Sequence, residues 1–307
     1  LNILKYRKEI DGLRALAVLP VIFFHAGYKI FNGGFIGVDI FFVISGYLIT
    51  TILIEDISKK NFSIIKFYDR RARRILPALF FIMLICIPFA WMWMLPTQME
   101  SFSRSLIAVT LFLSNILFWK EGGYFGSPVD EKPLIHSWSL SIEEQYYLLF
   151  PIFLIFFWKQ GKNKLFWIIL AISIISLSLS EWGWRNRPNA NFYLTPTRAW
   201  ELLIGSLTAI TIYKKKIRSN NLLSLIGFLV IIISIFVYDN STPFPSIYTL
   251  APVFGVILII VFGKDDAFIS KILGNKFLVK IGLISYSLYL WHQPLFAFFK
   301  ISPFYDD

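Results

Sequence analysis

A histidine, His25, lies near the end of an apolar stretch in which most side chains are soluble in lipid. The stretch PVIFFHAGYKIFNGG spans residues 20–34, and residues 15–24 in front of the histidine are all apolar. A titratable ring is costly to place beside hydrocarbon unless it has a partner or a task. Imidazole titrates near neutral pH and therefore suits a general base. We take His25 as the candidate catalytic residue.

Two further segments carry acidic and hydroxyl side chains at the start of apolar runs. Asp39 and Ser45 lie in GGFIGVDIFFVISG, and His136 and Glu143 lie in IHSWSLSIEEQYYLLFP. A carboxylate can orient an imidazole ring and stabilise the imidazolium that forms during catalysis. We predict that Glu143 or Asp39 does so for His25, and that His136 and Ser45 contact substrate. The other polar residues of the second segment are interpreted as helix caps: Ser139, Ser141 and Glu144.

Arg14 is a second polar residue in the first apolar segment. It precedes His25 by eleven residues, close to three helical turns, so both project from one helix face, about 16 Å apart along the axis. A charged face on an apolar helix must look into protein or a water-filled passage. The alternative for Arg14 is that its side chain extends to the inner membrane surface.

Four arginines lie within five positions of FYDRRARRILP, residues 67–77. The planar guanidinium fork suits bidentate binding of phosphate. We predict that Arg70, Arg71 and Arg74 bind a phosphate-rich cytosolic donor. Arg73 is interpreted as a charge that sets orientation in the membrane.

The composition predicts a helical membrane protein. Of the 307 residues, 56% are hydrophobic and only 16% are charged, and the mean hydropathy is +0.64. Soluble domains carry roughly 25% charged residues. The strand alternation of a membrane barrel is absent from the sequence. The net charge of +11 lies in short loops, where membrane orientation explains it better than nucleic acid does.

Ten apolar segments recur without an evident repeat or linker, so we predict one all-α domain over residues 1–307. The lone Cys86 excludes an intrachain disulfide and a cysteine-rich metal cluster. The expected fold is a polytopic transmembrane bundle of about 9–10 segments. They span about 10–27, 36–54, 75–95, 104–119, 140–158, 165–181, 199–213, 222–238, 248–262 and 281–299.

The charges decide the expected topology. With the N-terminus in the cytoplasm, the loop KKNFSIIKFYDRRARR returns there with seven positive residues, as the positive-inside rule requires. Ten full crossings would place KQGKNK and KKKIR outside. If the 104–119 segment is re-entrant, the cytoplasmic side holds 21 Lys and Arg residues and the outer loops hold 8. We therefore predict nine crossings, an external C-terminus and a re-entrant segment that lines a cavity.

Six motifs resemble, in order and spacing, those of the acyltransferase family 3 proteins, which are integral membrane O-acyltransferases of bacteria. They are YRKEIDGLRALAVLPVIFFHAG, GGFIGVDIFFVISGYLI, FYDRRARRILPAL, PLIHSWSLSIEEQYYLLFP, TPTRAWELLIGSL and SYSLYLWHQPL. The resemblance covers the whole chain and is strongest to enzymes that acetylate lipopolysaccharide O-antigen and other envelope glycans. It implies an acyl-CoA donor, catalysis by His25, and required roles for Arg14, Arg71 and Arg74. Members continue beyond LWHQPL, so a truncated C-terminus is expected, with a further span and an external hydrolase-like domain missing.

The expected mechanism follows from this placement. In the bacterial plasma membrane, cytosolic acetyl-CoA binds at the arginines and extends past Arg14 to His25. There His25 acts as base toward a glycan hydroxyl, or carries the acyl group covalently. The three histidines lack the close spacing of a metal site, so no metal is expected. His292 is interpreted as a buried hydrogen-bonding residue. The alternative function is a multi-span transporter of a small polar or acylated solute.

Overall fold

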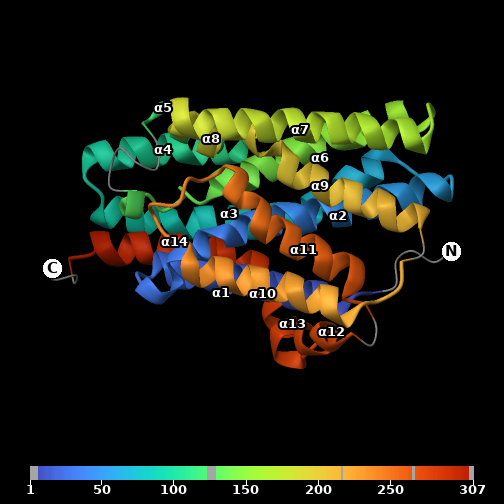
Figure 1. Ribbon diagram of the computed structural model, residues 1–307. Coiled ribbons are helices and arrows are strands. Elements are labelled where there is room, and N and C mark those ends of the chain that lie inside the picture. Colours follow the sequence, from blue (N-terminus) through green and yellow to red (C-terminus); the bar gives the residue numbers. More distant parts are fainter. Residues whose placement is uncertain (1–5, 123–128, 216, 265–266, 304–307) are drawn as a thin grey trace.

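The computed structural model describes residues 6–122, 129–215, 217–264 and 267–303, and within these ranges the regular structure is entirely helical (Figure 1). The all-α prediction is confirmed. The long helices are α1 (Lys8–His25), α2 (Gly37–Ser58), α3 (Ile64–Trp93), α6 (Ser137–Trp158), α7 (Lys162–Asn186), α9 (Thr195–Lys214), α10 (Asn221–Val237), α11 (Leu250–Phe262) and α14 (Ser285–Ile301). The short ones are η1 (Lys29–Ile36), α4 (Pro96–Thr110), α5 (Ser114–Lys120), η3 (Val129–Glu131), α8 (Pro188–Tyr193), η4 (Ile247–Thr249), α12 (Phe268–Leu273) and α13 (Lys276–Leu283).

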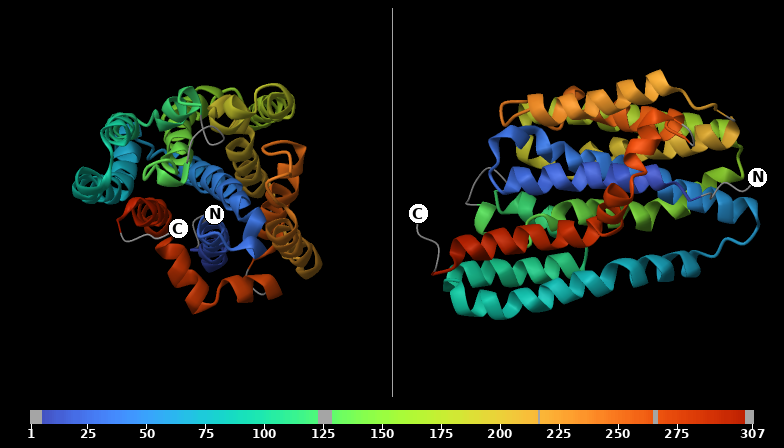
Figure 2. Two further views of the ribbon diagram at one scale, coloured as in Figure 1. Left: turned by 90° about the vertical axis from the view of Figure 1, so that its left-hand side faces the viewer. Right: turned by 90° about the horizontal axis from the view of Figure 1, so that it is seen from below.

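The long helices run side by side as one bundle (Figure 2). By length and composition, four described helices can cross a membrane: Lys29–Ser58, Ile64–Trp93, Ser137–Trp158 and Lys162–Asn186. Two shorter apolar helices, Asn221–Val237 and Ile247–Phe262, accompany them. In the most apolar 18-residue stretch of each, 78% of residues are buried for Lys29–Ser58, and 28–39% for the other three. Thus α2 is central, and the exposed apolar side chains of its neighbours face outward, as lipid contact requires.

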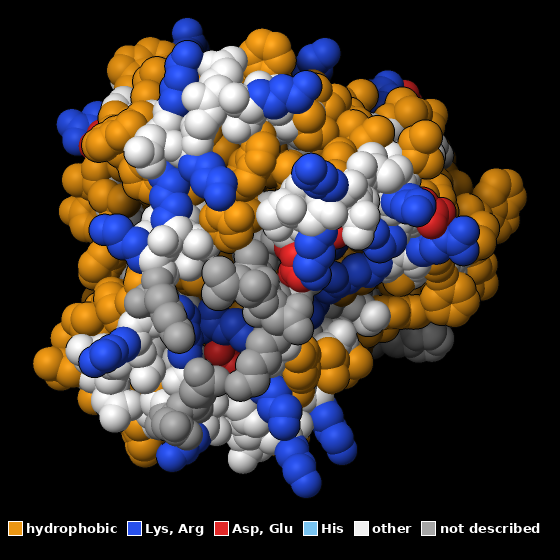
Figure 3. All heavy atoms as spheres, turned by 90° about the vertical axis from the view of Figure 1, so that its right-hand side faces the viewer, with side chains coloured by type: hydrophobic (Ala, Val, Ile, Leu, Met, Phe, Trp, Pro, Cys, Tyr) orange, Lys and Arg blue, Asp and Glu red, His pale blue; other side chains and the backbone are white. Residues whose placement is uncertain are grey.

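The bundle has two chemically different ends. At the basic end, α1 begins and α2 and α6 finish; at the histidine end, α1 finishes and α6 begins (Figure 1). Figure 3 views the basic end and shows many Lys and Arg side chains over this face, with few acidic ones. The predicted gathering of positive charge on one side is therefore present in the fold.

The segment predicted to be re-entrant forms a helical hairpin. Helix α4 leaves the histidine end, and α5 returns to it after a break in which Phe112 adopts a φ of 54°. Both ends of the hairpin lie at the histidine end, because Gln98 bonds to Glu131 and Lys132 bonds to Glu121. The hairpin covers 96–120 rather than 104–119, because Pro96 starts the first helix earlier.

Side chains of α6 satisfy the interrupted backbone of this hairpin. The hydroxyl of Ser141 accepts from the backbone N–H of Ser114 at 3.2 Å. The amide of Gln145 donates to the carbonyl of Phe112 at 2.9 Å. Broken helices are tolerated at membrane depth only where protein meets such groups. Ser141, which was interpreted from the sequence as a helix cap, therefore bonds to the backbone of the hairpin.

Two glycines bring α2 and α9 into backbone contact. A Cβ added at Gly46 would lie 1.9 Å from the carbonyl oxygen of Leu202, and one at Gly205 would lie 2.2 Å from that of Val43. Only glycine fits at either position without moving a helix. This close approach places the first turn of α2 beside the first turn of α9, where the charged residues described below meet.

Candidate active site

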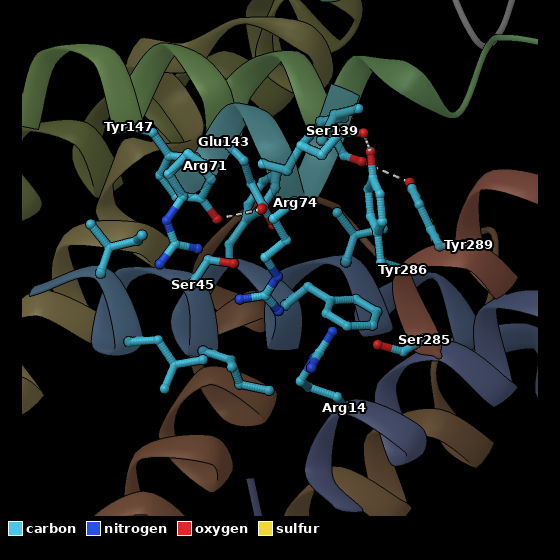
Figure 4. A pocket seen from close by; sticks show the side chains of 18 residues that line it. Arg14, Ser45, Arg71, Arg74, Ser139, Glu143, Tyr147, Ser285, Tyr286 and Tyr289 are labelled. Carbon is cyan, nitrogen blue, oxygen red and sulfur yellow. Dashed lines mark hydrogen bonds between the residues drawn. The ribbon is translucent and has the colours of Figure 1, made fainter. Parts of the chain in front are cut away.

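The larger of two cavities on the bundle axis contains most of the predicted donor-binding residues. It encloses about 850 Å³, including its open mouth, and lies between α1, α2, α3, α6 and α14. Figure 4 shows the side chains converging on it. Five residues named from the sequence line it: Arg14, Ser45, Arg71, Arg74 and Glu143.

Two of the three arginines predicted to bind phosphate face this inner cavity. Arg71 packs its guanidinium 5.8 Å from the ring centres of Phe67 and Tyr147, and Arg74 points into the cavity (Figure 4). The assignment of Arg70 is contradicted. Its side chain is 52% exposed and pairs with Asp56 at 2.8 Å, because the 100° turn per residue directs it away from the cavity face.

Arg14 lines the same cavity from α1, so it does not extend to the membrane surface. Its Nη1 lies 3.3 Å from Oδ1 of Asp11, which also accepts from the hydroxyl of Tyr6 at 2.7 Å. Three guanidinium groups thus surround one cavity. Among the described residues, Arg14 alone of the three forms an ion pair, with Asp11, so this cavity is suited to a polyanion.

Glu143 belongs to the inner cavity and not to His25. Its carboxylate accepts from the hydroxyl of Tyr147 at 2.7 Å (Figure 4). His25 lines a different cavity, nearer the histidine end. The predicted pairing of Glu143 with His25 is therefore contradicted, because Glu143 lies two turns into α6, deeper in the bundle than the first turn of that helix.

The outer cavity, of about 450 Å³, contains His25 and is mostly aromatic. Trp138 and Tyr289 line it together with two polar residues, His136 and Arg198. The remaining walls are Phe35, Val38, Ile135, Phe192 and Phe244. Such a dry, mostly apolar pocket with few polar groups is typical of a reaction site.

Three histidines that are far apart in the sequence meet here. The ring centres of His25 and His292 lie 5.1 Å apart, and those of His136 and His292 lie 5.4 Å apart. His292 is buried and bonds through Nδ1 to the carbonyl of Tyr289, as the sequence suggested, but its contact with His25 was not predicted. Within the described ranges, no cluster of His, Cys, Asp or Glu has the geometry to hold a metal ion.

A backbone carbonyl orients His25. Its Nδ1 lies 3.0 Å from the carbonyl oxygen of Val21. A carbonyl can only accept, so Nδ1 carries the hydrogen and Nε2 is the basic nitrogen of the neutral ring. The hydrogen-bond role that Asp39 or Glu143 was expected to fill is therefore met within α1 itself.

Asp39 instead forms a buried ion cluster. Its Oδ1 lies 3.0 Å from Nη2 of Arg198, and Oε1 of Glu201 lies 3.4 Å from Nε of the same arginine. All three side chains are at most 1% exposed. The prediction that Asp39 orients His25 is contradicted, because the close contact of α2 with α9 gives Asp39 a cationic partner. Arg198 was missed, although TPTRAWE contains it, because its position suggested an outer loop.

The two cavities adjoin at Val38 and Tyr289, which line both. The Tyr289 hydroxyl bonds to Ser139 at 2.7 Å and to the carbonyl of His136 at 3.1 Å, so it stands between them. Val38 and Tyr289 thus form the wall between the arginine-lined cavity and the cavity that contains His25.

The chain is similar in sequence to known O-acetyltransferases. The profile of the acyltransferase domain family matches residues 7–301. The peptidoglycan O-acetyltransferase OatA of Listeria monocytogenes is 36% identical over 95% of this chain and 49% of its own length. The O-acetyltransferase OatA of Staphylococcus aureus is 32% identical over 96% of this chain and 51% of its own. The chain thus spans about half the length of these curated relatives, and no solved structure matches it.

Proposed function

The chain belongs to acyltransferase family 3, and we propose that it transfers an acetyl group from cytosolic acetyl-CoA, across the membrane, to a hydroxyl of a cell-envelope glycan. The single observation that carries this proposal is the pair of adjoining cavities. One is lined by Arg14, Arg71 and Arg74, and the other holds His25. A multi-span transporter, the alternative from the sequence, does not explain this family membership.

Acetyl-CoA fits the two cavities by its chemistry. Its nucleotide phosphates match the arginines at the inner cavity, and its long neutral arm suits the apolar walls between α2 and α14. The thioester then lies in the outer cavity, where Nε2 of His25 accepts the proton of the attacking hydroxyl. The positive charge of the basic end supports a cytoplasmic orientation for that end, and with it a cytoplasmic N-terminus (Figure 3).

The proposed acceptor is peptidoglycan, because the Listeria monocytogenes relative is named a peptidoglycan O-acetyltransferase. The Staphylococcus aureus relative is named an O-acetyltransferase. Lipopolysaccharide O-antigen, the acceptor suggested by the family resemblance, stays an untested prediction. Both acceptors lie outside the cytoplasm, and both fit the position of His25 at the opposite end from the positive charge.

Labelled acetyl-CoA added to sealed vesicles of both orientations tests the proposal. We expect label on enclosed glycan in inside-out vesicles, where the basic end faces the donor, and no label in sealed right-side-out vesicles. The matched control is His25→Ala protein at equal abundance. Transfer that needs no donor on the basic side, or solute uptake without acylation, would contradict the proposal.

A further inference from the structure

Arg198 is a buried cation in the wall of the outer cavity. Its side chain is 1% exposed and it lines the cavity together with His25. Burying a charge at membrane depth is costly, so an intramembrane arginine without a task is rare. Two carboxylates form ion pairs with it: Asp39 on α2, and Glu201, which lies one turn after Arg198 on α9.

One nitrogen of Arg198 is left over from these contacts. Nη2 lies 3.0 Å from Asp39 and Nε lies 3.4 Å from Glu201 in ion pairs, although Nε makes no hydrogen bond. Nη1 is buried and has neither an ion pair nor a hydrogen bond in the described part of the chain. An unsatisfied buried donor costs about 1–3 kcal/mol, and more when it is charged. A donor of this kind in a cavity wall is suited to an oxygen atom that arrives with a ligand.

Aromatic rings surround the guanidinium. Its central carbon lies 5.4 Å from the ring centres of Phe42 and Trp138, 5.6 Å from that of Phe244 and 6.0 Å from that of Phe192. These rings hold the side chain in place and exclude water. Hydrogen bonds to developing charge are strongest in such a preorganised, low-dielectric site.

We propose that Arg198 is a catalytic residue whose Nη1 donates a hydrogen bond to the acyl oxygen as the group is transferred beside His25. This inference rests on the acyl-transfer function proposed above. Asp39 and Glu201 are then positioning residues, which aim Nη1 by binding the other two nitrogens. In this proposal Asp39 acts on the acyl oxygen through Arg198, and it does not act on the imidazole of His25.

The step balances as follows. The acceptor oxygen forms a bond to the thioester carbon, its proton moves to Nε2 of His25, and the carbonyl electron pair moves onto the acyl oxygen. That oxyanion accepts the hydrogen bond from Arg198. The carbonyl then re-forms, the carbon–sulfur bond breaks, and the proton on His25 passes to the departing sulfur.

Arg198→Gln and Arg198→Lys test the proposal, with Thr211→Ala as the matched control on the same helix but outside the cavity wall and the ion cluster. For each purified full chain we would measure kcat, donor dissociation constant and Tm. We expect Arg198→Gln to lower kcat about 10²–10³-fold with donor binding unchanged, as for other lost oxyanion donors. We expect Thr211→Ala, whose hydroxyl bonds only to the carbonyl of Leu207 within α9, to keep the wild-type kcat.

The outcomes separate a catalytic role from a structural one. A folded Arg198→Gln protein with wild-type kcat would overturn the proposal, as would losses of kcat that follow Tm equally in all three variants. If Arg198→Gln does not accumulate, Arg198→Lys decides. It keeps the charge but lacks the second terminal nitrogen, so a wild-type kcat there also overturns the proposal. Failure of the wild-type chain to use acetyl-CoA counts against the proposed function instead.

Discussion

The Nδ1 atom of His25 lies 3.0 Å from the carbonyl oxygen of Val21, one turn earlier on the same helix. This contact fixes the ring and its tautomer through a main-chain atom of the same helix. It leaves the carboxylates Asp39 and Glu143 for other tasks, one beside Arg198 and one in the arginine-lined cavity. His25, the proposed catalytic base, therefore lines one cavity, Glu143 lines the other, and Asp39 lies beside Arg198.

Replacing His25 by alanine is expected to abolish transfer. Loss of a general base lowers rates by about 10²–10⁴-fold, and the ring makes no contact that the helix needs in order to insert. Radiolabel transfer at equal protein abundance measures the effect, and donor binding should be unchanged. Wild-type rates from a well-expressed variant would remove His25 from the mechanism.

Arg71→Ala and Arg74→Ala are expected to weaken donor binding by about tenfold or more each, because each removes a charge-assisted contact to phosphate of roughly 1.5–3 kcal/mol. Donor titration at fixed ionic strength measures this.

The chain supplies two matched controls for these arginines. Arg70→Ala removes an arginine of the same motif that faces Asp56, and Lys214→Ala removes a charge that contacts Asn163 at the same end. Both should leave donor affinity within about twofold, as exposed charges contribute little. Equal losses in all four variants would leave only a general surface-charge effect.

Cysteine labelling tests the re-entrant hairpin. In a Cys86→Ser background, a cysteine at Lys162, which begins α7, should react only from the cytosol. A cysteine at Asp130, in η3 at the histidine end, should react only from outside. Ser127 lies outside the described residues, so Asp130 is the outer probe. Labelling of position 162 from outside would show the opposite orientation. Arg71 and Arg74 would then lie at the end of the bundle away from a cytosolic donor.

Gly205→Ala is expected to destabilise the protein by about 1–3 kcal/mol or more, as overpacking does. The new Cβ would lie 2.2 Å from the Val43 carbonyl and force α9 away from α2. The separation would also loosen the contact between Asp39 and Arg198, so transfer should fall with Tm. Thr211→Ala on the same helix is the control, because its hydroxyl bonds only within α9. An unchanged Tm for Gly205→Ala would contradict the prediction, because α2 and α9 would then move apart without loss of stability.

By itself, the sequence determined the helical class, and it predicted the hairpin near residues 104–119 and five residues that line the inner cavity. Apolar length and loop charge follow from membrane physics and can be counted along the chain. Helical periodicity places Arg14 and His25 on one face of α1, and the structure keeps both on the bundle axis. Only the tertiary structure decided which acid meets which base. The pairing of Asp39 with Arg198 depends on the glycine contact between α2 and α9, and the meeting of His25 with His292 depends on how α14 packs. Such contacts join residues more than 150 positions apart, and local pattern carries no information on that separation.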